Sequence, residues 1–298
     1  MEAVARASIA ASSRPRVPLC RRPRPRQCHA ARCLRGRSVA CAAAADADVV
    51  RLFDAAKLTV DEFVKSGMVV GLGSGAASGL AVQYLGTRLR RGSLTSIVGI
   101  PSSVICASEA EKAGIKVGSH EEGAQIDFAF ADADVIEEGT LAAVIGRGKT
   151  ESGQPSFIQE KGIVKSADKV AFIIDNDKYV NGIEGSIPVL VKSGNWIDTA
   201  EEIDDLFLGD AEVWRRPSIG TAGPSGGDFP LVTKEGHHIL DVIFTTPIQD
   251  LGKVAEGLEK IAGVVDHGII CNTTPYAVIA SKREVQVLDQ RSSVIPNT

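Results

Sequence analysis

A short glycine-rich segment carries the clearest chemistry in this 298-residue sequence. Residues 69–76 read VVGLGSGA, so an apolar run leads into Gly71, Gly73 and Gly75 before a helical pattern begins. Backbone amides at such a strand-to-helix turn lack partners within the helix, and the helix dipole makes this end positive. The segment predicts an anion site, above all for phosphate. The alternative is that the glycines only permit tight packing.

The same residues also match a dinucleotide-binding pattern. Gly71, Gly73 and Ala76 fit G-x-G-x-x-A, which requires an acidic residue at the end of the next strand to hold a ribose. That strand ends in VGIPSS, with Ser102 and Ser103 in place of the acid. We therefore favour a phosphate site over a nicotinamide site, and no cofactor is expected. The two serines can cap the next helix or donate to a ligand.

Three carboxylates and one lysine could act on a ligand at this place. Asp132 ends the apolar segment IDFAFAD, Asp134 follows it, and Glu160 lies in a helical pattern. A carboxylate beside a bound ligand can serve as a general base. Acids past a strand end also cap loops, and a helical glutamate is more often solvated, so both interpretations stay open. Lys178 follows KVAFIID and could contact substrate or remain a surface lysine.

Alternating apolar and helical segments must position these residues. Strands are expected at 68–72, 95–100, 115–119, 126–132 and 169–175, with helices near 46–66, 76–89, 102–114 and 156–165. Such alternation predicts an α/β fold with a parallel sheet, whose strands all end at one edge. From residue 187 the segments become shorter. We expect a Rossmann-like domain from 46–186 and 265–298, and a small α+β domain from 187–264.

The N-terminal segment differs from the rest in charge. Residues 1–45 hold ten arginines, no lysine and one acid, Glu2. This composition predicts a disordered transit peptide for import into an organelle, with the chloroplast stroma favoured over the mitochondrial matrix, and a basic arm for nucleic acid is the alternative. The remaining chain is acidic, which disfavours nucleic acid as a partner. No apolar run approaches the roughly 20 residues needed to span a bilayer, so no membrane partner is expected.

Cysteines and histidines suggest no metal. Only Cys106 and Cys271 lie outside the arginine-rich segment, so neither a disulfide framework nor a zinc site is expected. His237 and His238 lack partners at metal-binding spacing. The sequence therefore predicts a site made of backbone amides, hydroxyls and carboxylates.

Over residues 52–288 the sequence resembles type A ribose-5-phosphate isomerases. That family shows a VGxGTGST-like loop, a serine-rich second loop, DGADE-like and KGGGxA-like segments, a Glu-Lys pair, a strand ending near Asp with a lysine close by, and a P-V-E-V-like strand. The corresponding segments here are VGLGSGAAS, IPSSV, ADADV, IGRGK, QEKG, IIDNDK and IPVLV. TKEGHHILDVIF and IAGVVDHGIICNTTPYAVIAS continue the resemblance. It implies a Rossmann-like parallel sheet with a smaller inserted α+β (ferredoxin-like) domain, usually in a homo-oligomer.

The resemblance also implies an activity, the interconversion of ribose 5-phosphate and ribulose 5-phosphate through an enediolate, without cofactor. Glu160 would be the base, Asp134 would help open or orient the sugar ring, and Lys178 would contact the substrate. Such an enzyme would serve the pentose phosphate pathway and the Calvin cycle. The residues expected to bind the sugar phosphate are Gly73, Ser74, Gly75, Ala76, Ala77, Ser102, Ser103, Asp132, Gly146, Arg147, Gly148 and Lys178.

Several positions depart from the family pattern. Ala131 stands in place of the first acid, Gly146 in place of a lysine, and Ala76 and Ala77 in place of two hydroxyls. Arg147 or Lys149 is a candidate replacement for the lysine. These departures leave a second hypothesis, a catalytically impaired phosphosugar-binding or regulatory protein. A coenzyme A transferase is a weaker third, because no nucleophile loop is recognisable.

Overall fold

The structure is a computed structural model. The chain divides into two compact units, Met1–Ala42 and Ala43–Thr298. Most of the arginine-rich segment, Lys149 and the turn-rich TAGPSGGD segment lie outside the described residues. The residues that the structure describes are 38–119, 125–148, 157–219, 229–271, 273, 275–281 and 284–289, with side chains from residue 48 onward.

The first helix, α1 (Ser38–Phe63), begins earlier than the expected start near Asp46. The reason is local, because the added turns come from SVACAAAADA and alanine has the highest helix propensity. Further along α1, Ala55, Ala56 and Val60 are fully buried in the core. The helix therefore packs through its second half.

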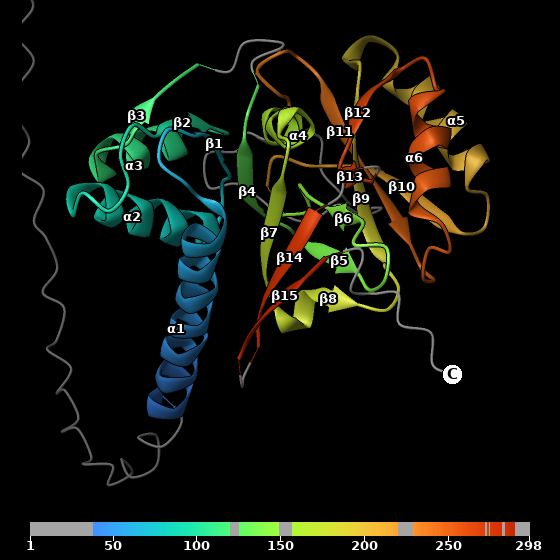
Figure 1. Cartoon of the computed structure of the whole chain (residues 1–298). Helices are drawn as coiled ribbons and strands as arrows, with labels where there is room; N and C mark the ends of the chain where they lie inside the picture. The colour runs from blue at the N-terminus through green and yellow to red at the C-terminus, as the bar shows by residue number, and fades with distance from the viewer. Residues whose placement is uncertain are drawn as a thin grey trace, which may run out of the picture. The chain divides into compact units, whose positions relative to one another are not determined.

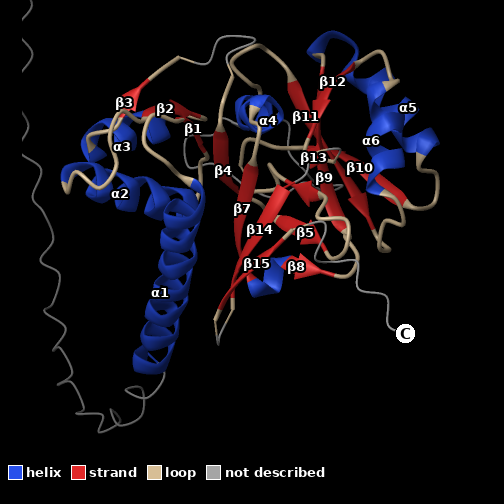
Figure 2. Cartoon of the chain, viewed as in Figure 1, coloured by secondary structure: helices blue, strands red, loops and turns tan. Residues whose placement is uncertain are grey.

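A seven-stranded sheet forms the first layer (Figures 1 and 2). Its strand order is β15-β14-β7-β4-β1-β2-β3, parallel except for the antiparallel edge strand β15. The six parallel strands follow the Rossmann order 3-2-1-4-5-6, which confirms the predicted fold class. The strands are β1 (Val69–Leu72), β2 (Val98–Pro101), β3 (Lys116–Val117), β4 (Phe128–Asp132), β7 (Val170–Asp175), β14 (Pro275–Ala280) and β15 (Val285–Leu288).

Three connections of this sheet contain the helices that the apolar spacing predicts, α2 (Ala76–Arg90), α3 (Val104–Ala113) and α4 (Phe157–Ser166). Strand β7 is followed by the 3₁₀ turn η1 (Asn176–Lys178). Strand β4 is apolar on both faces, since Phe128, Ala129, Phe130 and Ala131 are all buried. This is the pattern of a central parallel strand covered on both sides.

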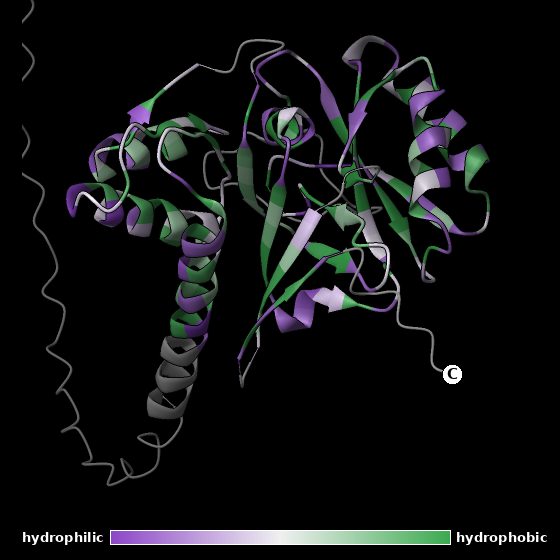
Figure 3. Ribbon diagram, viewed as in Figure 1, coloured by the Kyte–Doolittle hydropathy of each residue, from purple (hydrophilic) through white to green (hydrophobic). Residues whose placement is uncertain are grey.

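The second large sheet is four-stranded and antiparallel, with strand order β10-β11-β9-β12. Along the chain, strands and helices alternate as βαββαβ, which together with this order is the ferredoxin-like arrangement that was predicted. In Figure 3 the strands of both large sheets are mostly apolar, whereas α5 and α6 alternate polar and apolar residues. The elements are β9 (Gly185–Val191), η2 (Ser193–Asn195), α5 (Trp196–Leu206), β10 (Ala211–Arg215), β11 (His238–Phe244), α6 (Leu251–Glu259) and β12 (Val264–His267).

A third, small sheet was not expected. Its order is β13-β6-β5-β8, and its strands are β13 (Ile269–Ile270), β6 (Ala143–Val144), β5 (Val135–Glu137) and β8 (Tyr179–Val180). Strands of two or three residues are too short to show a period of two in the sequence. One apolar core nevertheless joins all three sheets through Ile136, Phe172, Leu190, Ile239 and Ile270. The boundaries at residues 186 and 264 stay predictions, because Ala43–Thr298 is one compact unit.

No helix in the described part of the chain is long and apolar enough to cross a membrane.

Candidate functional site

The glycine-rich loop lies at the point where the strand order of the large sheet reverses. Strand β1 pairs with β2 on one side and with β4 on the other, in parallel. Leu72 at the end of β1 is opposite Phe130 of β4, so the loop after Leu72 lies beside Asp132. In open α/β sheets ligands bind outside the carboxyl ends of the strands at this switch point.

Two glycines allow the close approach of the loop to β4. The amide of Gly73 donates to the carbonyl oxygen of Phe130 at 2.8 Å. A Cβ at Gly73 would lie 2.6 Å from the Cα of Ala131, and Gly75 has a φ of 143°, which L side chains rarely adopt. Tight packing therefore accounts for these glycines, and it also brings the start of α2 against the end of β4.

Glu160 is held against this loop from helix α4. The Ser74 amide donates to Oε1 of Glu160 at 3.3 Å, and the Ser74 hydroxyl donates to Oε2 at 3.1 Å. The Glu160 side chain is 7% exposed. Its neighbour Gln159 donates to the carbonyl oxygen of Pro101 at 3.1 Å, which ties α4 to the end of β2. The expected base therefore lies at the carboxyl edge of the large sheet.

The environment of Glu160 favours its protonated form. Burial raises the pKa of the carboxyl to about 8, and the charges of Asp132 and Asp134 raise it too, against the hydrogen bonds from Ser74. Among the described residues no basic side chain forms an ion pair with Glu160. A carboxyl with this pKa can both accept and return a proton near neutral pH.

Asp132 occupies the start of α2. Its Oδ2 accepts from the Ala77 amide at 3.0 Å, and its Oδ1 accepts from the Ser78 amide at 2.7 Å and the Ser78 hydroxyl at 2.6 Å. Burial raises the pKa of Asp132, whereas these hydrogen bonds and the charge of Lys178 lower it. Amides that were predicted to bind phosphate thus donate to a carboxylate of the protein.

Asp134 is held by the loop after β6. Its Oδ2 accepts from the Arg147 amide at 2.8 Å, and a Cβ on Gly148 would lie 3.9 Å from its Oδ1. The Arg147 guanidinium is directed elsewhere, because Nε donates to the Ser186 carbonyl oxygen at 2.6 Å and Nη2 to that of Glu184 at 2.8 Å. Arg147 therefore links this loop to β9.

Gly146 leaves no space for a side chain. Its φ is 86°, and a Cβ would lie 2.8 Å from the ring of Phe157. The position that was aligned with a family lysine therefore cannot carry one in this backbone. Lys149, the other candidate cation, lies outside the described residues.

The two serines after β2 differ. Ser103 caps α3, since its Oγ accepts from the Cys106 amide at 3.1 Å. Ser102 is fully buried, and its Oγ has no hydrogen-bond partner in the part of the chain that the structure describes. Lys178, after β7, donates to the Ala133 carbonyl oxygen at 3.2 Å. Ala76 begins α2 and is exposed.

Taken together, the structure brings one group of the predicted residues to the same loop. Ser74 is hydrogen-bonded to Glu160, and Ala77 to Asp132. The charge of Asp132 acts on Glu160, and that of Lys178 acts on Asp132. A second group, formed by Asp134, Arg147 and Gly148, meets next to it at the end of β4 and acts on Glu160 through the Asp134 charge. Ser103 serves a helix cap instead.

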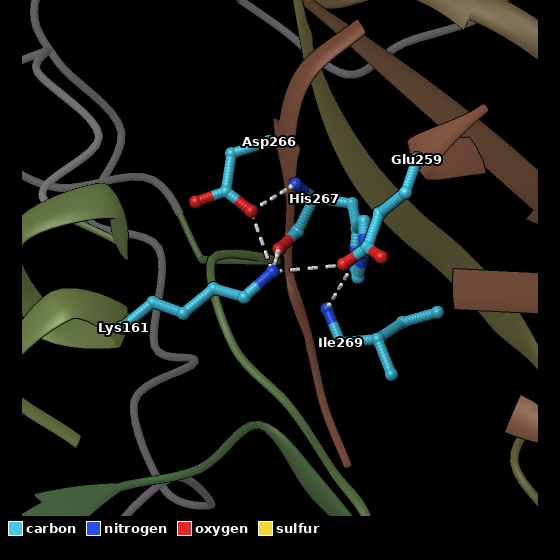
Figure 4. Close-up of polar contacts among 5 residues, drawn as sticks. All are labelled: Lys161, Glu259, Asp266, His267 and Ile269. Carbon is cyan, nitrogen blue, oxygen red and sulfur yellow. Dashed lines mark hydrogen bonds and ion pairs between the residues drawn. The ribbon is translucent and has the colours of Figure 1, made fainter. Parts of the chain in front are cut away.

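A buried lysine next to the expected base was missed. Lys161 is 1% exposed, and its Nζ donates to Oδ1 of Asp266 at 2.5 Å and to the His267 carbonyl oxygen at 2.6 Å (Figure 4). Burial and the Lys161 charge lower the pKa of His267 to about 4. The Ile269 amide donates to Nδ1 of this neutral ring at 3.2 Å, so Nε2 carries the hydrogen and faces Glu259. The only signal in the sequence was a Glu-Lys pair in an apolar helix.

A second buried pair was also missed. Arg216 after β10 pairs with Asp241 of β11, at 2.9 Å from Nε and 2.5 Å from Nη2. Its Nη1 donates to the Gly146 carbonyl oxygen at 2.9 Å, and the Ser186 hydroxyl donates to Asp241 at 2.6 Å. This network fixes the Gly146 loop from the antiparallel sheet. In the sequence this pair is visible only as a charged residue in each of two strand segments, Arg216 in AEVWRR and Asp241 in HILDVIF.

The structure also holds a cavity of about 640 Å³. None of the predicted site residues lines it. Its lining is Glu137, Thr140, Leu141, Ala142, Gln249, Asp250, Leu251, Gly252, Ile270, Cys271 and Thr273.

Comparison with known proteins gives consistent matches. The family model for ribose 5-phosphate isomerase A (phosphoriboisomerase A) matches residues 98–284. The chain is 34% identical over 241 residues to ribose-5-phosphate isomerase A of Synechococcus sp. (strain JA-3-3Ab), covering 80% of this chain and 97% of the relative. It is 33% identical to the probable ribose-5-phosphate isomerase 3, chloroplastic, of Arabidopsis thaliana, covering 76% and 79%.

Solved structures agree. Ribose 5-phosphate isomerase from Plasmodium falciparum matches with a TM-score of 0.69 at 28% identity, over 81% of this chain and 98% of that one. A D-ribose-5-phosphate isomerase in complex with phospho-erythronic acid matches with a TM-score of 0.69 at 26% identity, over 80% and 98%.

Proposed function

The chain belongs to the ribose 5-phosphate isomerase A family, and from that membership we propose that it interconverts ribose 5-phosphate and ribulose 5-phosphate. One observation carries the proposal most directly. Glu160 is a buried carboxyl with a pKa of about 8. It accepts a hydrogen bond from Ser74 of the glycine loop, at the switch point of the sheet. Proton transfer needs a base of this kind beside a place where a sugar can bind.

In the proposed reaction the ionised Glu160 removes the proton from C2 of the open-chain aldose. The C–H electron pair forms the double bond of an enediolate, and Glu160 returns the proton to C1 while the O2 proton moves to O1. Asp134 would help open or orient the ring, and Lys178 would stabilise the negative oxygen. Asp134 is held for this task by the Arg147 amide.

The test is conversion of ribose 5-phosphate by the full chain. We expect turnover by wild type and a loss of about 10² to 10⁴ in kcat for Glu160→Gln, the usual contribution of a positioned general base. Glu201→Gln, an exposed carboxylate on α5, is the matched control and should keep full activity. Equal activity of wild type and Glu160→Gln would remove Glu160 as the base.

A second candidate function is a catalytically impaired phosphosugar-binding or regulatory homologue. One observation favours it, since Gly146 has no space for the family lysine. Calorimetry with ribose 5-phosphate separates the two candidates, because binding without turnover supports this one.

Further proposals concern the setting of the reaction. We propose import into the chloroplast stroma, supported by the ten arginines of residues 1–45 and by the chloroplastic name of the Arabidopsis relative. There the activity would serve the pentose phosphate pathway and the Calvin cycle. Fusion of residues 1–45 to a fluorescent protein tests import.

We also propose that the chain forms a homo-oligomer, which light scattering tests. Turnover after treatment with a chelator tests whether the reaction needs a metal.

A further inference from the structure

A buried ion pair of the antiparallel sheet reaches the loop that holds Asp134. Arg216 and Asp241 are both 5% exposed, and the guanidinium meets the carboxylate through Nε at 2.9 Å and Nη2 at 2.5 Å. The remaining guanidinium nitrogen, Nη1, donates to the carbonyl oxygen of Gly146 at 2.9 Å. The pair therefore acts on the backbone just after β6, outside its own sheet.

A second set of contacts fixes the next residue of this loop. Nε of Arg147 donates to the Ser186 carbonyl oxygen at 2.6 Å. The Ser186 hydroxyl donates to Oδ1 of Asp241, the same oxygen that accepts from Nη2 of Arg216. These bonds close a ring through Arg216, Gly146, Arg147, Ser186 and Asp241. A buried polar network whose members are satisfied in this way is rigid, so the backbone at the loop has little freedom.

One peptide group of the loop connects the ion pair to Asp134. The carbonyl oxygen of Gly146 and the amide of Arg147 belong to the same peptide group, and that amide donates to Oδ2 of Asp134 at 2.8 Å. Its plane is thus fixed at both ends. A charged donor on the carbonyl oxygen also polarises the peptide group, which strengthens its N–H as a donor. Asp134 in turn lies close enough to Glu160 for its charge to raise the pKa of that base.

We propose that Arg216, paired with Asp241, is a positioning residue for the isomerisation. It fixes and polarises the peptide group between Gly146 and Arg147, whose N–H holds the Asp134 carboxylate in place to act on the sugar ring. Arg216 acts only through this peptide group and does not touch the substrate. The inference rests on the proposed isomerase function, and it adds a group from the antiparallel sheet to the machinery of that site.

Replacing both members of the pair tests the proposal, because apolar residues of similar volume often replace a buried ion pair without loss of stability. Arg216→Met with Asp241→Leu should lower kcat by about 10²-fold with KM little changed, the scale of a misplaced reacting group. Arg88→Met with Asp61→Leu is the matched control, since it removes another Arg–Asp pair, between α1 and α2, and should keep full activity. Wild-type kcat in a folded Arg216 and Asp241 double variant would overturn the proposal.

A cycle with Asp134 separates positioning from a general effect on the fold. If the ion pair acts through Asp134, its removal in an Asp134→Ala background should change kcat by no more than about twofold, because the group that it positions is already gone. A further loss as large as in the wild-type background would show that the pair acts by another route and would overturn the proposal.

Arg216→Lys guards against a folding defect in the double variant. The lysine keeps the charge opposite Asp241, but a single ammonium group lacks the fork that serves both Asp241 and the Gly146 carbonyl oxygen. We expect kcat to fall in the same direction by a smaller factor. Should the double variant fail to fold, full activity of Arg216→Lys would overturn the proposal.

Hydrogen exchange of the Arg147 amide tests the same link without turnover. In the ¹⁵N-labelled full chain this amide should exchange at least about tenfold faster when Arg216 and Asp241 are replaced, as expected for the loss of a charge-assisted hydrogen bond on its peptide group. The Arg88 and Asp61 control should leave it unchanged. Equal protection in all three proteins would overturn the proposal. No turnover by any of them defeats the isomerase function, while the exchange rates still decide whether Arg216 fixes this peptide group.

Discussion

Glu160 and Lys161 are adjacent on helix α4 and both are buried, yet their surroundings differ completely. Successive helical residues point about 100° apart, so Glu160 faces the glycine loop and Lys161 faces β12. Lys161 has an opposite charge and two further acceptors at its ammonium group. Glu160 has the hydrogen bonds of Ser74 and two carboxylates nearby.

The difference separates two roles of a buried ionisable group, one structural and one catalytic. A buried charge with an opposite partner holds two elements together, here α4 and β12, although burial also lowers the pKa of Lys161. A buried carboxyl among like charges lacks such a partner and is available for proton transfer. The Lys161 cluster also holds the helix that carries Glu160. The four predictions that follow test this contrast.

The largest difference is expected in stability. Lys161→Met removes the ammonium group that donates to Asp266 and to the His267 carbonyl, and we expect a loss of about 3 kcal/mol, at the lower end for a broken buried pair because Asp266 is partly exposed and keeps the hydrogen bond from the His267 amide. Glu160→Gln keeps the shape and removes a disfavoured charge, so its stability should match or exceed that of wild type. Urea unfolding of the three proteins at pH 7 measures this. Equal losses of unfolding free energy in Lys161→Met and Glu160→Gln would contradict this contrast.

The second prediction concerns the pH dependence caused by Glu160. Its folded pKa of about 8 lies above the roughly 4.3 of an unfolded glutamate, so its favourable contribution is present below pH 4 and is lost as the pH rises through 8. Relative to wild type, Glu160→Gln should gain stability over this window by at most about 1.4 kcal/mol per pH unit. Isomerase activity should rise toward pH 8, as the base ionises. Urea unfolding and rate profiles from pH 5 to 9 check both, and a constant difference would contradict the account.

His267 should have the opposite pH dependence. Its folded pKa of about 4 lies below the roughly 6.5 of an unfolded histidine, so its contribution is present above pH 6.5 and is lost as the pH falls toward 4. His267→Gln should lose less stability on acidification than wild type, by about 1 to 2 kcal/mol between pH 6.5 and 5. Thermal unfolding at the two pH values measures the difference. Identical acid sensitivity would mean that His267 is not held neutral.

The smallest effects are expected at the neighbouring serines 102 and 103, a second adjacent pair with different surroundings. Ser103→Ala removes the α3 cap and should cost about 1 kcal/mol. Ser102→Ala removes a buried hydroxyl without a hydrogen-bond partner in the described part of the chain, so its stability should be unchanged or slightly higher. Urea unfolding compares them. A loss at Ser102 as large as that at Ser103 would show that its hydroxyl is used.

Much of the large sheet could be predicted because its signals are local. The run VVGLGSGA predicted β1, the loop and the start of α2 at nearly the observed residues. The alternation of segments predicted a parallel sheet, because parallel neighbours need helical crossovers between them. Strands β5, β6, β8 and β13 could not be predicted, since two or three residues carry no measurable period.

In the candidate site, too, local features could be predicted and contacts between distant segments could not. The position of Asp132 at the end of a strand could be predicted. Its contact with the Ala77 amide could not, because Ala77 and Asp132 are 55 residues apart in sequence and meet only through the pairing of β1 with β4. Lys161 reads as an ordinary helical lysine, because its partner Asp266 is 105 residues away.

The succession of strands and helices along the chain and the glycine turn follow from apolar spacing and residue type, which act over a few neighbours. Which charges are paired, and which amides remain for a ligand, was decided only when distant segments packed together. The physical reason is that burial and Coulomb interactions depend on distance in space, and the chain sets that distance only by folding.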